Sequence, residues 1–297
     1  MNIEQLLRCK TILELVEKGK YPTLKELNEA VNYMLGKLHE LNDSNCKSIT
    51  DRTTKRDIKD IRSLLRVYID YDIINKGYYI EDKDYNENEC NALLEAANLV
   101  FVLQNMDNVK GNISFEPRKA KRGTVHFFEI LEAIRKRHKI SFNYTHYEKK
   151  ESTNREVSPL GLKEFKGFWY LVAHDGKAFK TFGLDRISDL QVIKTGKSYY
   201  PKDFSLEKHY EHCYGIVRFY DEEPQVIIIK TTPIKASYYK ANPLHKSQKI
   251  VDDTDKFTIF SIFAYLTYDL QQELLSHGKE EVTVIQPSDG LVIKRYY

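Results

Sequence analysis

The spacing of apolar residues changes along the chain, and this change most constrains the fold. Up to residue 65 the apolar positions recur at helical spacing, and the first segment shows it with Ile3, Leu6, Leu7, Ile12, Leu13 and Val16. From residue 140 onward, short runs rich in aromatic and β-branched residues are separated by turn residues, which indicates strands. A chain of 297 residues is also long for a single hydrophobic core. We therefore expect an α+β protein of several domains.

Residues 1–80 predict three helices followed by a hairpin. The helices cover residues 3–17, the stretch from Pro22-Thr23 to Leu38, and residues 50–65. Two short strands follow, joined by a turn at Asn75-Lys76-Gly77. Three helices and a hairpin in this order are the outline of a winged helix-turn-helix domain.

The third of these helices has one basic side. At about 100° per residue, its cations fall within a stripe of about 120°, opposite Ile58, Ile61, Leu64 and Leu65. A helix of this length fits the major groove of DNA, and its N-terminal end favours phosphate. We predict a DNA-binding set of Arg52, Thr53, Thr54, Lys55, Arg56 and Lys59, with Lys76 from the hairpin as a backbone contact. The alternative is an amphipathic surface helix with a solvated face.

Charge is distributed unevenly, although the net charge is only +3. Residues 47–66 contain seven basic residues against three acids, and residues 110–155 contain twelve against five. Local excesses of this kind favour anionic partners such as nucleic acid, and solvated lysines are the alternative.

The rest of the chain predicts a linker and two further domains. Residues 81–123 are expected to form a helical linker. Residues 124–200 predict a small β-barrel, with a helix at 125–138 and strands at 140–144, 168–173, 178–184 and 189–193. Residues 210–297 alternate between strands and helices, which predicts a small α+β sandwich of ferredoxin-like type.

Sequence signatures of catalysis and of cofactor binding are absent. The chain lacks the common phosphate-loop, dinucleotide, zinc-protease and nucleophile-elbow motifs. His209, His212 and Cys213 have no second half of a metal site, and the acids at 252, 253 and 255 fit a turn. We expect no enzyme activity, no cofactor and no metal.

The four cysteines are far apart, which favours reduced thiols in the cytoplasm. No window approaches the length of a membrane helix, and the first ten residues do not fit a signal peptide. We expect a cytoplasmic protein without a membrane partner.

Five sequence blocks carry a family resemblance. T-D-R-T-T-K-R-D-I-K-D-I (50–61, with Thr50 first) resembles the recognition-helix signature of winged-helix regulators that carry a WYL domain. I-S-F-N-Y (140–144), R-E-V-S-P-L-G-L (155–162), G-F-W-Y-L-V-A (167–173) and F-K-T-F-G-L-D-R-I (179–187) resemble the WYL domain in the same order. The resemblance implies an Sm-like five-stranded barrel that senses a ligand, and a C-terminal extension that makes dimer contacts.

The barrel blocks also contain a candidate ligand site. A basic, hydrogen-bonding pocket for a nucleotide, a small anion or single-stranded nucleic acid is predicted from Tyr144, Arg155, Tyr170, Lys180 and Arg186. The alternative is that Arg155-Glu156 and Asp185-Arg186 are local ion pairs. Trp169 and Tyr170 point to opposite faces of a strand, so one belongs to the core and the other to the pocket. Lys180 and Gly183 stand where many family members carry arginine, which predicts a less charged or shallower pocket.

These features predict a ligand-responsive transcriptional regulator that binds a double-stranded operator as a homodimer. The competing hypothesis is a nucleic-acid-processing accessory protein or enzyme whose barrel holds a single-stranded substrate. A third is an interaction scaffold.

Overall fold

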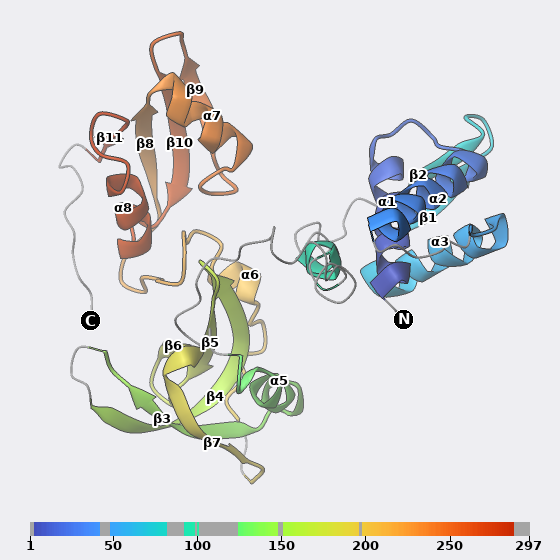
Figure 1. Cartoon of the computed structure of the whole chain (residues 1–297). Coiled ribbons are helices and arrows are strands. Elements are labelled where there is room, and N and C mark those ends of the chain that lie inside the picture. The colour runs from blue at the N-terminus through green and yellow to red at the C-terminus, as the bar shows by residue number, and fades with distance from the viewer. Residues whose placement is uncertain are drawn as a thin grey trace. The chain divides into compact units, whose positions relative to one another are not determined.

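The computed structural model describes residues 3–41, 48–81, 92–98, 100, 124–147, 151–195 and 198–287. The chain divides into two compact units, Met1–Glu116 and Pro117–Tyr297 (Figure 1). Helices dominate the described part of the first unit, and the second unit contains two β-sheets with helices. The protein is thus a mixed α+β chain with more than one domain. Most of the linker expected at 81–123 lies outside the described residues.

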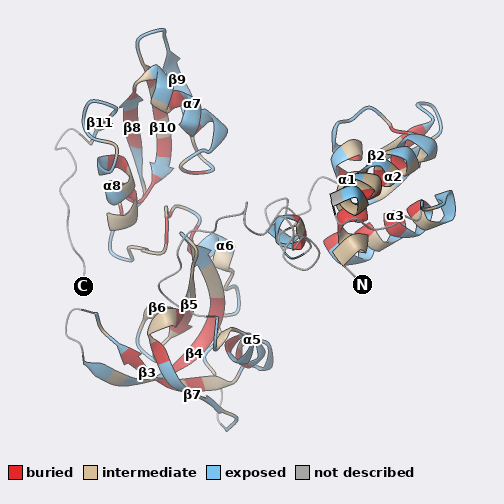
Figure 2. Ribbon diagram, viewed as in Figure 1, coloured by how far each residue is buried: buried red, intermediate tan, exposed pale blue. Residues whose placement is uncertain are grey.

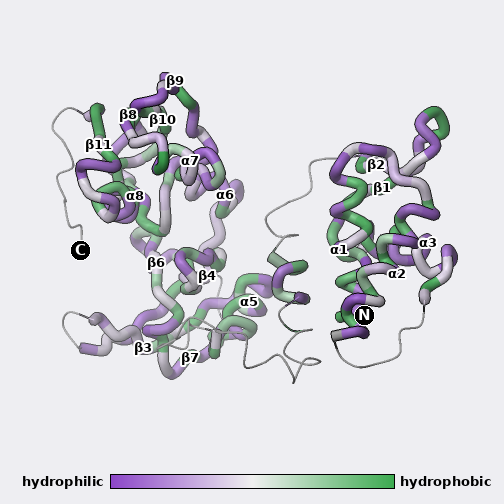
Figure 3. Tube along the Cα trace, turned by 45° about the horizontal axis from the view of Figure 1, so that its top comes forward, coloured by the Kyte–Doolittle hydropathy of each residue, from purple (hydrophilic) through white to green (hydrophobic). Residues whose placement is uncertain are grey.

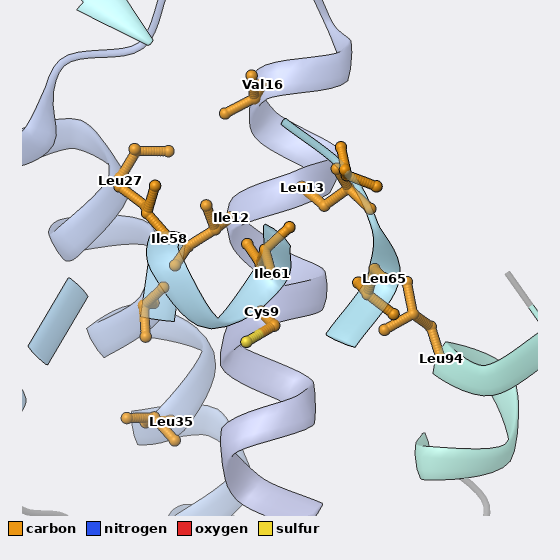
Figure 4. Close-up of a cluster of buried hydrophobic side chains, with 12 residues drawn as sticks. Cys9, Ile12, Leu13, Val16, Leu27, Leu35, Ile58, Ile61, Leu65 and Leu94 are labelled. Carbon is orange, nitrogen blue, oxygen red and sulfur yellow. The ribbon is translucent and has the colours of Figure 1, made fainter. Parts of the chain in front are cut away.

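The first unit contains α1 (Ile3–Glu17), α2 (Leu24–Leu41) and α3 (Asp51–Leu65), followed by the antiparallel hairpin of β1 (Ile69–Asp72) and β2 (Gly77–Ile80). Apolar and polar residues alternate along the helices (Figure 3). Their apolar sides meet in one core, to which α1 gives Cys9, Ile12, Leu13 and Val16, and to which Leu94 also belongs (Figure 4). The helix and hairpin order expected for residues 1–80 is therefore observed.

The hairpin is held against the start of α2. Tyr78 donates its backbone N–H to the Pro22 carbonyl at 2.9 Å. A Cβ on Gly77 would collide with the backbone carbonyl of Tyr21, so only glycine fits at this position. The following residues Thr23 and Glu26 form a capping box that starts α2.

The second unit begins with α5 (Phe127–Lys136) and a five-stranded antiparallel sheet. Its strands are β3 (Lys139–Thr145), β4 (Ser152–Phe165), β5 (Phe168–His174), β6 (Phe179–Gly183) and β7 (Ile187–Ile193), with a short 3₁₀ turn, η2 (Leu184–Arg186), before β7. The strand order is β6-β5-β4-β3-β7. Figure 2 shows the buried residues of this sheet and of α5, which include Ile130, Ala133, Phe142 and Leu171.

Strand β4 was not among the strands expected from the sequence, although it is the longest of the described strands. Pro159 and Gly161 both disfavour strand structure. The structure accommodates them at a shift in the pairing register between β4 and β5. A bulge at a bend of the sheet explains why the sequence pattern is interrupted there.

A second, four-stranded antiparallel sheet follows a short helix, α6 (Leu206–His209). Its strands are β8 (Gln225–Thr231), β9 (Lys249–Asp253), β10 (Thr258–Ala264) and β11 (Val282–Gln286), in the order β11-β8-β10-β9. Helices α7 (Pro233–Ala241) and α8 (Tyr268–Leu275) contribute Ala236, Tyr239, Leu270 and Leu274 to its core. The strand and helix alternation expected for the last third of the chain is observed.

Candidate nucleic-acid interface and ligand site

The exposed side of α3 presents four cations, Arg52, Lys55, Arg56 and Lys59, which we call the basic face. Together with Thr53 they line a hollow in the surface of the first unit. The only ion pair among them within the described residues is a long contact of 4.0 Å between Arg56 Nη2 and Asp57 Oδ1. Cations that are exposed and largely unpaired are available to an anionic partner.

Thr54 does not belong to this surface. Its side chain is completely buried, and its hydroxyl accepts a hydrogen bond from Asn28 Nδ2 at 3.0 Å. Asn28 Nδ2 and Asn32 Nδ2 also donate to the Ile49 carbonyl, and Asn32 Oδ1 accepts from the Ile49 N–H. The Thr54 side chain is therefore not exposed to a partner on this surface. Thr54 fastens the first turn of α3 to α2.

A buried ion pair holds the inner side of α3. Arg8 Nε donates to Asp57 Oδ2 at 2.7 Å and Arg8 Nη2 donates to Asp57 Oδ1 at 3.1 Å. Both side chains are buried, and Asp57 faces inward from the middle of α3. Both groups lose their hydration on burial, so separating them would leave an uncompensated buried charge. A bidentate pair of this kind therefore fixes the rotation of the helix about its axis. The sequence shows the two charges but not that they meet across 49 positions.

The C-terminal end of α3 differs from the expected pattern in two places. Arg62 stacks its guanidinium over the Tyr68 ring at 4.4 Å, which holds this cation beside the hairpin. Leu64, expected on the core side, is exposed. The helix ends at Arg66 in a left-handed conformation with φ 56°.

The hairpin offers little attraction to phosphate. Lys76 is exposed at the turn, with φ 52°. Asp72 closes the same turn by accepting hydrogen bonds from the backbone of Ile74 and Asn75, which lowers the pKa of its carboxyl. The hairpin also carries Asp70, so acids outnumber bases around Lys76. The structure thus gives Lys76 less electrostatic support than the basic face of α3.

The aromatic pair that opens β5 divides between two faces. Trp169 packs against the core of the five-stranded sheet, and its ring meets that of Phe127 edge to face at 4.7 Å. Tyr170 points to the opposite side of the strand, opposite Gly183 in the register with β6. Burial raises the pKa of Tyr170, which is also influenced by the charges of Asp185 and Arg186.

Tyr144 and Arg186 lie together, with two residues that were not expected in the site. Tyr144 is buried and its hydroxyl accepts a hydrogen bond from the Gly183 N–H at 3.3 Å. The Arg186 guanidinium lies 5.0 Å from the centre of the Tyr144 ring and 5.1 Å from that of Tyr147. The Tyr147 hydroxyl donates to Asp185 Oδ2 at 2.5 Å. We call Tyr144, Tyr147, Asp185 and Arg186 the tyrosine–arginine site.

Two arginines in this domain have unsatisfied donors. The Nε atoms of Arg155 and Arg186 are buried and have no hydrogen-bond partner among the described residues. Glu156 pairs with Lys139 at 2.9 Å, and no ion pair joins Arg155 to Glu156 or Arg186 to Asp185 in the described part of the chain. The alternative of local ion pairs at these positions is therefore not observed. An unpaired, partly buried guanidinium favours an anionic ligand.

Arg155 and Lys180 form no hydrogen bond or ion pair with the tyrosine–arginine site among the described residues. Arg155 stands opposite Phe142 in the pairing of β3 with β4. Lys180 is exposed and stands opposite Ala173 in the pairing of β5 with β6. Of the five predicted ligand residues, Tyr144 and Arg186 are thus in contact, Tyr170 feels the charge of Arg186, and the place of Arg155 and Lys180 in the site stays a prediction.

His209 and Cys213 serve packing. His209 is buried beside Phe179, Phe204 and Tyr210, and this burial lowers its pKa to about 4. Burial raises the pKa of Cys213 to about 11, so its thiol stays protonated near neutral pH. The described residues contain no group of three or more metal-ligating side chains. Within the same residues, every helix is too short or too polar to cross a bilayer.

Comparisons with known proteins match one family model and two solved structures to this chain. Residues 125–192 match the family model described as the WYL domain. The structure is similar to that of proteasome accessory factor B/C (PafBC) of Arthrobacter aurescens, with 23% identity and a TM-score of 0.32, over 97% of this chain and 44% of that chain. It is also similar to a structure described as a CRISPR Cas-related protein, with 15% identity and a TM-score of 0.38, over 97% of this chain and 81% of that one. No curated protein sequence matches the chain.

Proposed function

We propose that this protein is a ligand-responsive transcriptional regulator without enzyme activity. In this proposal the first unit is a winged helix-turn-helix domain that binds double-stranded operator DNA through α3. The WYL domain is an Sm-like barrel that senses a small anion, a nucleotide or a single-stranded nucleic acid. The observation that carries the proposal is the basic face of α3, which follows two helices and precedes a hairpin.

The basic face has the properties that a DNA reader needs. Its side chains project from the first three turns of α3, toward the end of a recognition helix that enters the major groove first. The helix itself is fixed on its inner side by Asp57 and at its first turn by Thr54. A rigid helix with free cations can contact phosphates and base edges without paying to break ion pairs or to order its backbone.

A homodimer completes the proposal, because two recognition helices read a palindromic operator. We propose residues 210–297, with the four-stranded sheet, as the dimerisation domain. A bound ligand regulates only if it binds one arrangement of the two helices better than another.

DNA binding is tested with operator fragments selected from a random library by the wild-type protein. Arg52→Ala/Arg56→Ala should weaken binding on the order of 100-fold, because two contacts to phosphate or base edges are lost. Lys25→Ala/Lys37→Ala is the matched control, since it removes the same charge from α2, where both lysines pair with glutamates of the same helix. Equal binding by the two double variants would exclude α3 as the reader.

Ligand sensing is tested by titrating nucleotides and short single-stranded oligonucleotides while following Trp169 fluorescence. Trp169 is the only tryptophan and touches Phe127 in the same domain, so it reports on this sheet alone. The response should vanish in Arg186→Ala. A response that survives would place the ligand elsewhere. Turnover of labelled DNA or RNA in the presence of magnesium would favour the competing hypothesis of a nucleic-acid-processing enzyme.

A further inference from the structure

Asp185 and Arg186 are neighbours of opposite charge that do not form an ion pair. Both are partly buried, where an unpaired charge is costly. Arg186 instead lies against two tyrosine rings, and its buried Nε has no partner among the residues that the structure describes. Something in the structure must therefore keep the carboxylate from the guanidinium.

The Tyr147 hydroxyl occupies the Asp185 carboxylate. It donates a hydrogen bond to Asp185 Oδ2, and bonds to a charged acceptor are stronger than bonds between neutral groups. The same bond is the main reason why the pKa of Tyr147 is raised, so the hydroxyl keeps its proton at neutral pH. Tyr147 lies at the protein surface and is 67% exposed, so burial in a core does not explain its position.

The two charges are nevertheless close enough to meet. An added Cβ on Gly183 would lie 2.6 Å from Asp185 Oδ1 and 2.9 Å from Arg186 Nη2. Both side-chain ends thus lie over the bare backbone of Gly183. Without a competing donor, the Asp185 carboxylate would be drawn to the guanidinium.

We propose that Tyr147 is a positioning residue for an anion-binding site at Arg186. Its hydroxyl holds the Asp185 carboxylate away from the guanidinium, and this leaves Arg186 free for a phosphate or carboxylate group of the ligand. The Tyr144 and Tyr147 rings flank the guanidinium and orient its donor edge. This inference rests on the proposed function of the WYL domain as a sensor, and it names the ligand chemistry and the residue that keeps the site open.

The test measures binding of a fluorescent, 5′-phosphorylated short oligodeoxynucleotide to the full chain. All variants carry Arg52→Ala/Arg56→Ala, so that α3 contributes little to the signal. Tyr147→Phe should weaken binding on the order of tenfold, since it keeps the ring but releases Asp185 to neutralise Arg186. Asp185→Asn should bind at least as tightly as its parent, because the competing charge is gone.

The decisive measurement is the double variant. If Tyr147 acts through Asp185, Tyr147→Phe should have no further effect in the Asp185→Asn background. A loss of the same size in both backgrounds would show that Tyr147 only supports the fold or touches the ligand itself, and would overturn the inference. So would an unchanged affinity of Tyr147→Phe alone.

Arg186→Ala separates this inference from the proposed function. It should abolish binding in every background, and inorganic phosphate should compete with the oligonucleotide. Binding that depends on Arg186 but not on Tyr147 overturns the inference and leaves the sensor in place. Binding that ignores Arg186, or none by the parent protein, removes the proposed ligand site and the inference together.

Discussion

The basic face of α3 and the tyrosine–arginine site present their cations in opposite ways. Arg52 and Lys55 project freely into solvent, and the structure controls only the helix beneath them. Arg186 is held at its sides by two rings, with its Nε already removed from water. The first arrangement fits a long, uniformly charged partner such as duplex DNA. The second fits one small anionic group at a fixed place.

The largest expected effect concerns the buried ion pair of Arg8 and Asp57, which holds the inner side of α3. Arg8→Ala leaves the completely buried Asp57 carboxylate without its hydrogen-bonded partner, and should lower the free energy of unfolding of the first unit by about 3–5 kcal/mol. Chemical denaturation followed by circular dichroism measures the loss. Arg66→Ala, which removes an exposed arginine at the end of the same helix, should change stability by less than about 0.5 kcal/mol. A loss below about 1 kcal/mol for Arg8→Ala would mean that packing alone orients α3.

Salt should separate the two sites next. Raising the salt concentration about fourfold should weaken operator binding on the order of 100-fold, because exposed cations release the counterions of many phosphates. Binding of inorganic phosphate at Arg186 should change only a few-fold, since one partly buried contact is screened less. The two titrations are run on the same protein by fluorescence anisotropy and by calorimetry. If the two binding affinities fall equally with salt concentration, the distinction between the two sites is contradicted.

A smaller effect is expected at the ring that supports Arg186 from the core side. Tyr144→Phe keeps the ring but leaves the buried N–H of Gly183 without its acceptor, and should destabilise the second unit by about 1–2 kcal/mol. Thermal unfolding followed by Trp169 fluorescence reports on this unit. Because the ring stays, phosphate binding at 25 °C should change little. A large loss of binding would assign the hydroxyl a direct contact with the ligand.

The smallest effect concerns the two neighbouring threonines of α3. Thr54→Val removes the acceptor for Asn28 Nδ2, which keeps the Ile49 carbonyl, and should cost about 1 kcal/mol of stability. Thr53 lies at the hollow that the basic face of α3 lines. Thr53→Val should cost less than about 0.5 kcal/mol of stability and should change the affinity for DNA instead. Denaturation measures the stability of both variants, and a gel shift measures their affinity for DNA. The reverse result would return Thr54 to the DNA-binding surface.

Elements were easier to predict from this sequence than contacts. Helical spacing and turn residues located α1, α2, α3 and most strands of the second unit, because these signals are local. Pro159 and Gly161 concealed β4, since a bulge breaks the alternation that marks a strand. Residues Thr53 and Thr54 have the same chemistry, and only the helix rotation set by Asp57 decides which of them is buried.

The candidate sites show the same limit. Local charge patterns placed four exposed cations on α3, and motif resemblance led to Tyr144 and Arg186. Tyr147 was missed because the hairpin of β3 and β4 brings it to Asp185 across 38 positions. Arg155 and Lys180 were grouped with Arg186 by residue type, and among the described residues no hydrogen bond or ion pair ties either of them to the tyrosine–arginine site. A pattern of charges along a chain does not say which of them share a face.

The pair of Arg8 and Asp57 has a consequence for the design of truncated fragments of this protein. A fragment that starts at the second helix keeps the basic face of α3 and every residue of the hairpin. The truncated fragment would still expose the inner side of α3 and leave the Asp57 carboxylate there without Arg8. Under the proposed function, the minimal DNA-binding fragment must therefore begin at the first helix, because Arg8 of that helix holds α3 in its orientation.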